Sequence, residues 1–291
     1  MIMYKIKLMA DSACDISKEN EEKYGIKILC FPITVGDKNF HDRDMNIKEY
    51  YNLIMNSTEL PKHSQITPMV YKECFEQYYS EGYTDVFYAA IASKGSNTIN
   101  SAKTAKISFF EEHPDAEGKF RIRILDSGNY TGTIGYPVIQ AAIKAEKGIS
   151  PDEIEDYLTD WYSAAEVHFG CYSLEFVKKS GRVSSAAGFV GEVLGLRPII
   201  CIKQGVSQVE AKVRGDKAVV PKLADVICDR IIPGSPYIIM EGYDVNYTDD
   251  LEKELTKRLG YPPEMRFDIG GVIAANCGPR TVAAAFKAKS V

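Results

Sequence analysis

The stretch TDVFYAAIASKGSNTINSAKTA, residues 84–105, decides the fold. Its β-branched and aromatic run, 86–91, ends in the polar segment 93–98, and a helical pattern follows at once. In an open α/β sheet the carboxyl end of a strand faces a crevice, and the next helix N-terminus offers unpaired N–H groups and the positive end of a dipole. Such a junction suits an anionic head group, so Ser93 is the first candidate site residue.

Outward from this stretch, strand and helix patterns alternate through the first half of the chain. This alternation predicts an α/β fold with a mostly parallel, three-layer sheet. The expected strands are 6–10, 26–35 and 120–125, with 86–91 between the last two, and the expected helices are 17–24, one beginning at Pro68, 96–112 and 132–147. A helix capped at Ser150 and running to about residue 165 bridges to the second half.

The second half shows a different pattern. Strands at 198–203 and 206–214 flank a Gln204-Gly205 turn and read as a hairpin, and further strands are expected at 167–172, 236–240 and 269–275. We therefore predict two domains: an N-terminal α/β domain, 1–165, and a C-terminal mixed α+β domain, 166–291. A ligand is expected between them.

Composition excludes several classes of protein. The 291 residues carry a net charge of −5 with a pI near 5.6, which argues against nucleic-acid binding. Seven scattered cysteines without a C-x-x-C pair read as reduced core residues. No apolar run reaches the roughly 18 residues of a membrane span, and the first residues lack a secretory pattern, so we expect a cytoplasmic protein without an integral membrane segment.

Two further loops of small polar residues follow predicted strands. Asp11-Ser12 follows the first strand and Asp126-Ser127 follows strand 120–125. Carboxyl ends of parallel strands share one sheet edge, so these loops and Ser93 should converge on one crevice. The alternative is that each Asp-Ser pair simply caps a helix.

Two more segments supply candidate donors. His63 lies among hydroxyls in a loop with Ser64 and Thr67, although a lone loop histidine is usually a surface residue. Asn276 is placed at the carboxyl end of the strand predicted over 269–275. The segment around His41 and Asp42 lacks a matching ligand cluster elsewhere, so it is interpreted as a solvated turn and no metal site is predicted.

The chain lacks a G-x-G-x-x-G after its first strand and any G-x-x-x-x-G-K-[ST], so no nucleotide cofactor is predicted. Residues 174–217 differ in charge from the rest, with eight positive and four negative side chains, a balance of +4 that leaves −9 elsewhere. This asymmetry suits an acidic partner or a phosphate group, with Arg182, Lys212 and Arg214 as candidates. A hairpin with ordinary solvated lysines is the alternative.

A serine hydrolase is a rival interpretation. Ser93, Asp126 and His168 occur in the order of nucleophile, acid and base found in α/β-hydrolases. Against it, the segment 91–95 lacks the first glycine of a nucleophile elbow, and His168 falls at the start of a strand rather than in a loop.

Taken together, these segments resemble the DegV family of bacterial fatty-acid-binding proteins. The matching segments lie in the family's order along nearly the whole chain: Asp11-Ser12 with Asp15, Ser64-Gln65 with Pro68, Ser93 with Ser96 and Thr98, Asp126-Ser127, Gly181-Arg182, 198–205, Lys212-Val213-Arg214 and Gly278-Pro279. Each match is weak alone, but the ordered set is specific.

The resemblance implies a carrier rather than an enzyme. It implies one palmitate-, stearate- or oleate-like fatty acid between the domains, with its carboxylate near Ser93 and no cofactor. In some members of the family the lipid is presented to a separate, ATP-using fatty acid kinase subunit that makes an acyl phosphate. By this resemblance Arg182 and Arg214 would lie near the kinase, while a lipid sensor without a kinase partner remains an alternative.

This chain departs from the family pattern at two positions. His63 stands where the family often has Thr, and Asn276 stands where it often has His. A buried carboxylate needs several charge-assisted hydrogen bonds. We therefore hypothesise that the histidine has moved across the head-group site, so that Ser93, His63 and Asn276 together form a carboxylate clamp, with Ser64 and Thr67 as nearby hydroxyls.

Overall fold

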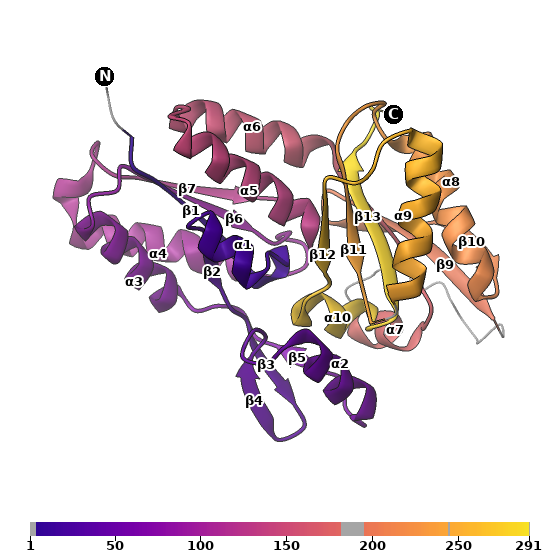
Figure 1. Ribbon diagram of the computed structural model, residues 1–291. Helices are drawn as coiled ribbons and strands as arrows, with labels where there is room; N and C mark the ends of the chain where they lie inside the picture. Colours follow the sequence, from indigo (N-terminus) through magenta and orange to yellow (C-terminus); the bar gives the residue numbers. More distant parts are fainter. Residues whose placement is uncertain (1–3, 182–194, 244, 291) are drawn as a thin grey trace.

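A computed structural model describes residues 4–181, 195–243 and 245–290 (Figure 1). The first of its three sheets, sheet A, is wholly parallel and has the strand order β2-β1-β6-β7. Its strands are β1 (Ile6–Asp11), β2 (Lys27–Leu29), β6 (Asp85–Ala90) and β7 (Arg121–Asp126). All four carboxyl ends therefore point toward one edge.

The largest sheet, sheet C, has six strands in the order β10-β9-β8-β13-β11-β12. Neighbouring strands are antiparallel except for the parallel pair of β11 and β12. The strands are β8 (Ala165–Cys171), β9 (Leu196–Lys203), β10 (Val206–Arg214), β11 (Tyr237–Glu241), β12 (Met265–Asp268) and β13 (Thr281–Lys287). The predicted fold class, a parallel first sheet followed by a mixed second one, is confirmed.

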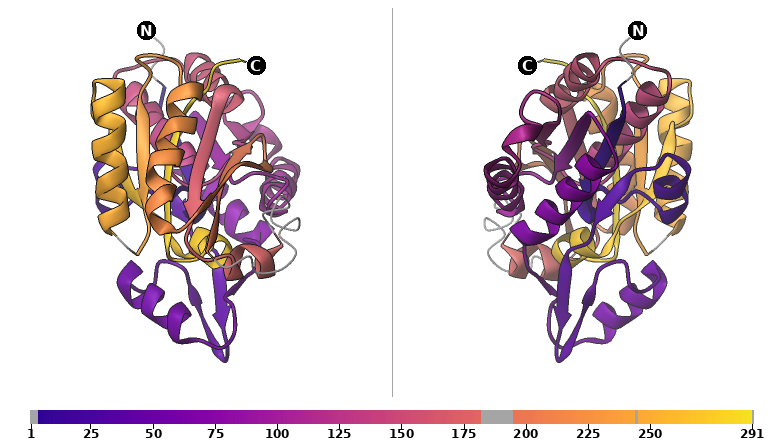
Figure 2. Two further views of the ribbon diagram at one scale, coloured as in Figure 1. Left: turned by 90° about the vertical axis from the view of Figure 1, so that its right-hand side faces the viewer. Right: turned by 90° about the vertical axis from the view of Figure 1, so that its left-hand side faces the viewer.

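A small third sheet, sheet B, projects from the body together with one helix (Figures 1 and 2). It contains β3 (Pro32–Val35), β4 (Lys38–His41) and β5 (Lys62–His63), and the helix is α2 (Ile47–Asn56). The prediction of one strand over 26–35 is wrong. Phe31 donates its N–H to Ser12 Oγ at 3.2 Å and accepts the Asp42 N–H at 3.1 Å, so the chain leaves sheet A there and begins sheet B.

Helices separate and cover the two large sheets. On one side of sheet A lie α3 (Pro68–Ser80) and α4 (Thr98–Glu112), whereas α8 (Val219–Arg230) and α9 (Val245–Leu259) cover the outer face of sheet C (Figures 1 and 2). Between the sheets lies α5 (Gly132–Glu146), which contacts strands of both. Residues 132–139 of this helix are all buried, as expected for a helix packed on several sides.

Two short helices lie near the junction of the sheets, α7 (Glu175–Ser180) and α10 (Gly271–Cys277), while α1 (Lys18–Lys23) follows the first strand (Figure 1). The prediction of a strand over 269–275 is wrong, because this segment forms α10 and the strand begins only at Thr281. A short apolar run does not distinguish a buried helix from a buried strand. Contacts from α2 settle the choice, since Tyr50 donates its hydroxyl to the Gly271 carbonyl at 2.9 Å.

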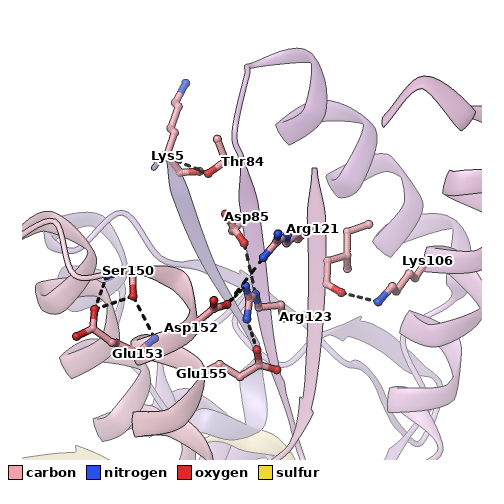
Figure 3. A network of polar contacts seen from close by, with 11 residues as sticks. Lys5, Thr84, Asp85, Lys106, Arg121, Arg123, Ser150, Asp152, Glu153 and Glu155 are labelled. Carbon is pink, nitrogen blue, oxygen red and sulfur yellow. Dashed lines mark hydrogen bonds and ion pairs between the residues drawn. The ribbon is translucent and has the colours of Figure 1, made fainter. Parts of the chain in front are cut away.

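Charged side chains fasten α6 (Pro151–Ala164) to the amino ends of sheet A, opposite the edge where the polar loops gather (Figure 3). Arg123 is almost buried and lies 3.3 Å from Asp85 and 2.6 Å from Asp152, and it also contacts Glu155. Asp85 is only 3% exposed. The arginine therefore compensates a buried carboxylate while joining a helix to the sheet.

One hydrophobic cluster runs through sheet A, α5 and the inner face of sheet C, and a second lies beneath α8 and α9. The first cluster crosses the predicted boundary between residues 165 and 166, so the two halves share a core, and the division into 1–165 and 166–291 stays a prediction. No helix among the described residues combines the length and apolar character needed to cross a membrane.

Candidate ligand-binding site

The loop after β6 is held by Asp126, the last residue of β7. Ser93 donates its N–H to Asp126 Oδ1 at 3.1 Å, and the same oxygen accepts the Gly128 N–H at 2.9 Å. Within the loop, the N–H groups of Gly95 and Ser96 both donate to the Ala92 carbonyl. Asp126 therefore fixes the backbone of the loop and leaves the Ser93 side chain exposed toward solvent.

An apolar cavity lies between the carboxyl edge of sheet A and the inner face of sheet C. Almost all of its lining surface is apolar, as in most small-molecule sites. Apolar walls come from β8, β9, β13, α10 and the residues just after β6 and β12: Ile91, Val167, Phe169, Ile202, Ile269, Ile273 and Ala283. The sequence does not reveal them, because wall residues and core residues share one hydrophobic pattern.

A polar groove adjoins this cavity. It is lined by the Ser93 loop with Lys94 and Asn97, by Gln65, and by the β9–β10 turn. His63 and Gly95 line both the groove and the cavity. The apolar space therefore opens onto polar side chains at these two residues.

His63 and Asn276 face the cavity from different elements. The half-buried His63 belongs to β5 and packs edge-on against Phe31, with ring centroids 5.8 Å apart. Asn276 lies in the last turn of α10, where its Nδ2 donates to the Val272 carbonyl at 2.7 Å. One N–H of the amide is thereby engaged within the helix, and the other makes no hydrogen bond to a described residue.

The remaining head-group candidates lie elsewhere. Ser64 and Thr67 are exposed and line neither the cavity nor the groove. Ser12 Oγ accepts the Phe31 N–H, and Ser127 Oγ hydrogen-bonds to the backbone of Asn129. These polar groups hold the chain in place, and their contribution to a ligand site stays a prediction.

The side chain of Asp11 lies in the protein interior. It is fully buried, and its Oδ2 accepts the Tyr88 hydroxyl at 2.9 Å and the Ile91 N–H at 2.8 Å. Burial raises the pKa of Asp11 to about 7, although these two hydrogen bonds oppose the shift. The residue therefore fixes the end of β6 from inside the sheet.

The turn between β9 and β10 closes one side of the groove. Gly205 donates its N–H to the Gly128 carbonyl at 2.6 Å, and Gln204 donates from Nε2 to the Tyr162 carbonyl at 2.8 Å. Gln204 has a φ of +49°, and a Cβ on Gly205 would lie 3.0 Å from Lys94. The hairpin predicted at this turn is confirmed, and it joins sheet C to the Ser93 loop.

The hydrolase interpretation does not fit this geometry. His168 lies on β8, fully buried, with Nε2 2.9 Å from Glu166 Oε2 and its ring stacked on Phe286 in the outer core. In a triad Asp126 would accept a hydrogen bond from the histidine, but here its Oδ1 accepts the backbone N–H of Ser93. The three residues therefore do not form a triad.

A metal ion at Glu166, His168 and Cys201 is also disfavoured by charge. Their donor atoms lie within 4.8 Å of one another. Arg230, however, pairs with both carboxylate oxygens of Glu166, and Lys203 Nζ lies 3.3 Å away. Burial alone would raise the pKa of Glu166, but hydrogen bonds from His168 and Arg230 lower it to about 2. This carboxylate is already neutralised by cations, so a metal ion would meet positive charge.

The structure describes two of the three basic residues proposed for partner docking. Lys212 and Arg214 are exposed on β10, two residues apart and so on the same face of this edge strand. Arg182 lies outside the described residues.

Two sheets enclosing an apolar cavity that opens at a polar strand-end loop define an α/β protein built to hold a small molecule. The chain belongs to the DegV family: the family model "Uncharacterised protein, DegV family" matches residues 5–289. A DegV domain-containing protein of Clostridium perfringens is 26% identical over 287 residues, covering 98% of this chain and 99% of its own.

Solved structures share the whole architecture. A stearic acid-binding protein from Eubacterium ventriosum superimposes with a TM-score of 0.86 at 25% identity, over 98% of both chains. The Streptococcus pneumoniae Fatty Acid Kinase B3 protein, loaded with linoleic acid, gives a TM-score of 0.83 at 20% identity over 98% of this chain and all of its own. At that identity the second comparison shows the fold alone.

Proposed function

We propose that the protein binds one long-chain fatty acid, with the tail in the apolar cavity and the carboxylate at its mouth. The observation that carries the proposal is the meeting of apolar cavity and polar groove at His63 and Gly95. An amphipathic molecule with one anionic end matches this arrangement. The stearic acid-binding protein, which shares the fold along its length, supports the same ligand class.

The tail provides most of the affinity. Burying about 15 methylenes at about 0.8 kcal/mol each gives an upper limit near 12 kcal/mol. Hydrogen bonds to the head group add only a few kcal/mol, because each replaces one made to water. The cavity walls therefore select the length and shape of the acyl chain, and the polar mouth sets the orientation of the fatty acid.

The carboxylate is held by donors from three segments. Ser93 offers a hydroxyl from the groove, His63 an imidazole at the junction, and Asn276 the remaining N–H of its amide. A protonated His63 would add a charge-assisted bond, which is the strongest of the three. His63 lines the groove together with Ser93 and the cavity together with Asn276, which supports the proposed exchange of the histidine across the site.

We extend the proposal to acyl phosphate formation by a separate ATP-using kinase subunit. One carboxylate oxygen would attack the γ-phosphorus of ATP, the bond to the β-phosphate oxygen would break, and ADP would leave. Two observations support this role. Ser93 is exposed, so a carboxylate there is accessible from solvent, and Lys62 and Lys179 line a hollow that also includes His63 and Asn276.

A lipid sensor that never meets a kinase is the alternative. Lys212→Glu with Arg214→Glu tests the difference, because both side chains lie on exposed β10 rather than in the cavity. Loss of acyl phosphate formation with retained lipid affinity would support docking of the kinase on this strand. Unchanged turnover would contradict it.

The decisive experiment on binding is organic extraction and mass spectrometry of the purified protein, followed by titration of delipidated protein with palmitate, stearate and oleate. We expect one fatty acid per chain. His63→Ala should weaken affinity about 10- to 150-fold, in line with about 1.5–3 kcal/mol for a hydrogen bond to a charged group. His41→Ala, which removes an exposed imidazole from β4, is the matched control. Absence of co-purified lipid and of saturable binding would contradict the proposal.

A further inference from the structure

A second hollow lies where the three sheets meet. Asp15 follows β1 of sheet A, Asp42 follows β4 of sheet B, and Asp268 ends β12 of sheet C, and all three line the same hollow. Asp42 is only 5% exposed, so the predicted solvated turn is wrong at this residue. The hollow is separate from the proposed lipid cavity and shares none of its lining residues.

Asp15 is held in an unusual conformation. Its φ of +57° lies in the left-handed region, which Asp tolerates better than most residues. Asp15 is 9% exposed, and a side chain at position 270 would come within 2.5 Å of its Oδ1. Gly270 therefore lets the segment between β12 and α10 come close to this carboxylate.

These carboxylates are poorly compensated within the described part of the chain. Neither oxygen of Asp15, nor Oδ1 of Asp42, accepts a well-aligned hydrogen bond from a described residue. Burial raises the pKa of Asp15 well above its usual range, against the effect of the nearby Gly270 N–H, and the charges of Asp42 and Asp268 raise it further. Burial likewise raises the pKa of Asp42 to about 6, although hydrogen bonding by Ser12 and the charge of Arg43 oppose the shift.

Two of the three cations that line the hollow pair with other acids, although the charge of Arg43 still lowers the pKa values of Asp15 and Asp42. Arg43 lies 2.8 Å from Glu21, which is outside the lining, and Arg266 lies 2.8 Å from Asp249 and 2.9 Å from Glu241. The lining as a whole has five acidic and three basic side chains: Asp15, Asp42, Asp44, Glu241 and Asp268 against Lys18, Arg43 and Arg266. The three bases balance Asp44, Glu241 and Asp268, so the excess of two negative charges equals the charge of the two buried carboxylates.

We propose that Asp15 and Asp42 bind a divalent cation, Mg²⁺ or Ca²⁺, that keeps part of its water shell. Hard carboxylate oxygens without nitrogen or sulfur ligands select these ions over transition metals. Among the described residues, only Glu166, His168 and Cys201 bring three ligand atoms within 4.8 Å of one another. Asp15, Asp42 and Asp268 do not form such a group, so the proposed ion would be held through two carboxylates and would complete its shell with water.

A cation bound at this site would help to hold the sheets in their relative positions. Tyr51 donates its hydroxyl to the Ile269 carbonyl at 2.5 Å and Tyr50 to the Gly271 carbonyl, so α2 already holds the segment that leads into α10. A cation at Asp15 and Asp42 would tie sheets A and B together beside the same segment. Because α10 carries Asn276, the ion would steady one side of the proposed lipid mouth.

The test is thermal unfolding of the full chain, delipidated and stripped of metal by a chelator, at pH 7.5. MgCl₂ and CaCl₂ are titrated separately against NaCl at matched ionic strength. At ten times the Kd, we expect a saturable rise in Tm of about 2–5 °C. Asp15→Asn and Asp42→Asn, which keep the side-chain shape, should abolish this rise.

The control is Asp156→Asn, which changes an exposed carboxylate of α6. It should respond to Mg²⁺ or Ca²⁺ as the wild type does. The proposal is overturned if neither ion exceeds the effect of NaCl, or if Asp15→Asn and Asp42→Asn respond like Asp156→Asn. It is equally overturned if ethylammonium chloride, titrated in parallel, gives the saturable response and the metal ions do not, since the site would then take an organic cation.

Discussion

Asp11→Asn should reduce the pH dependence of stability. Asp11 is fully buried, and its pKa is about 7 in the folded protein against an ordinary value of 3.8. Between these two values the folded state binds more protons than the unfolded state, so stability falls as the pH rises from about 4 to about 7. Asparagine has no such proton, and its side-chain oxygen can still accept from Tyr88 and Ile91.

The magnitude follows from the shift in pKa. Each unit corresponds to about 1.36 kcal/mol, and between pH 5 and pH 8 a group with these two pKa values loses about 2.5 kcal/mol of stabilisation. The wild type should therefore lose about 2.5 kcal/mol more than Asp11→Asn over this interval. Asp15 and Asp42, whose pKa values are also raised by burial, contribute in the same direction, but they do so in both proteins.

Urea denaturation of delipidated protein at pH 5, 6, 7 and 8 measures this difference. The fluorescence of Trp161, the single tryptophan, serves as probe, because its indole is buried and donates to the Thr133 carbonyl at 3.1 Å. Asp156→Asn, on the exposed face of α6, should follow the wild type. Parallel pH profiles for wild type and Asp11→Asn would refute the reasoning.

Three further predictions concern the cavity and the helix anchor. Gly95→Ala should weaken fatty acid affinity about 5- to 100-fold, since a Cβ there would overlap the Tyr130 hydroxyl at the mouth and overpacking costs about 1–3 kcal/mol; calorimetric titration with unchanged affinity would contradict this. Ala283→Phe should fill part of the cavity and weaken stearate more than decanoate, by about 0.8 kcal/mol for each methylene displaced, and equal losses for both would argue against a tail at β13. Arg123→Met should lower the free energy of unfolding by about 3–5 kcal/mol, because Asp85 stays buried and unpaired; stearate affinity should be unchanged, and a loss below 1 kcal/mol would show that the network of Figure 3 is dispensable.

Local sequence was enough to predict the framework. The alternation of strands and helices, the cap at Ser150 and the Gln204-Gly205 turn all depend on neighbours within a few residues. In the structure Ser150 and Glu153 form a capping box, and the turn joins β9 to β10 as expected. Ser93 was placed beyond a strand end by the same local reasoning, because the polar segment follows the apolar run directly.

Where distant segments compete for the same residues, local patterns were misleading. Residues 269–275 have the composition of a strand, yet they form α10 because α2, more than 200 residues earlier, packs against them and bonds the Gly271 carbonyl. Residues 26–35 read as one strand, yet contacts of Phe31 with Ser12 and Asp42 divide it between two sheets. Neither outcome is encoded in a periodicity.

For the ligand site, the sequence by itself determined the chemical kind of residue available: a serine at a strand end, a histidine among hydroxyls, and an amide before Gly278. Only the tertiary structure decided that His63 and Gly95 lie where an apolar cavity meets a polar groove, and that Asp15 and Asp42 face one hollow from different sheets. The physical reason is that burial and charge proximity depend on how whole sheets pack. Hydrophobic periodicity records that a side chain is buried but not which empty or charged space it borders.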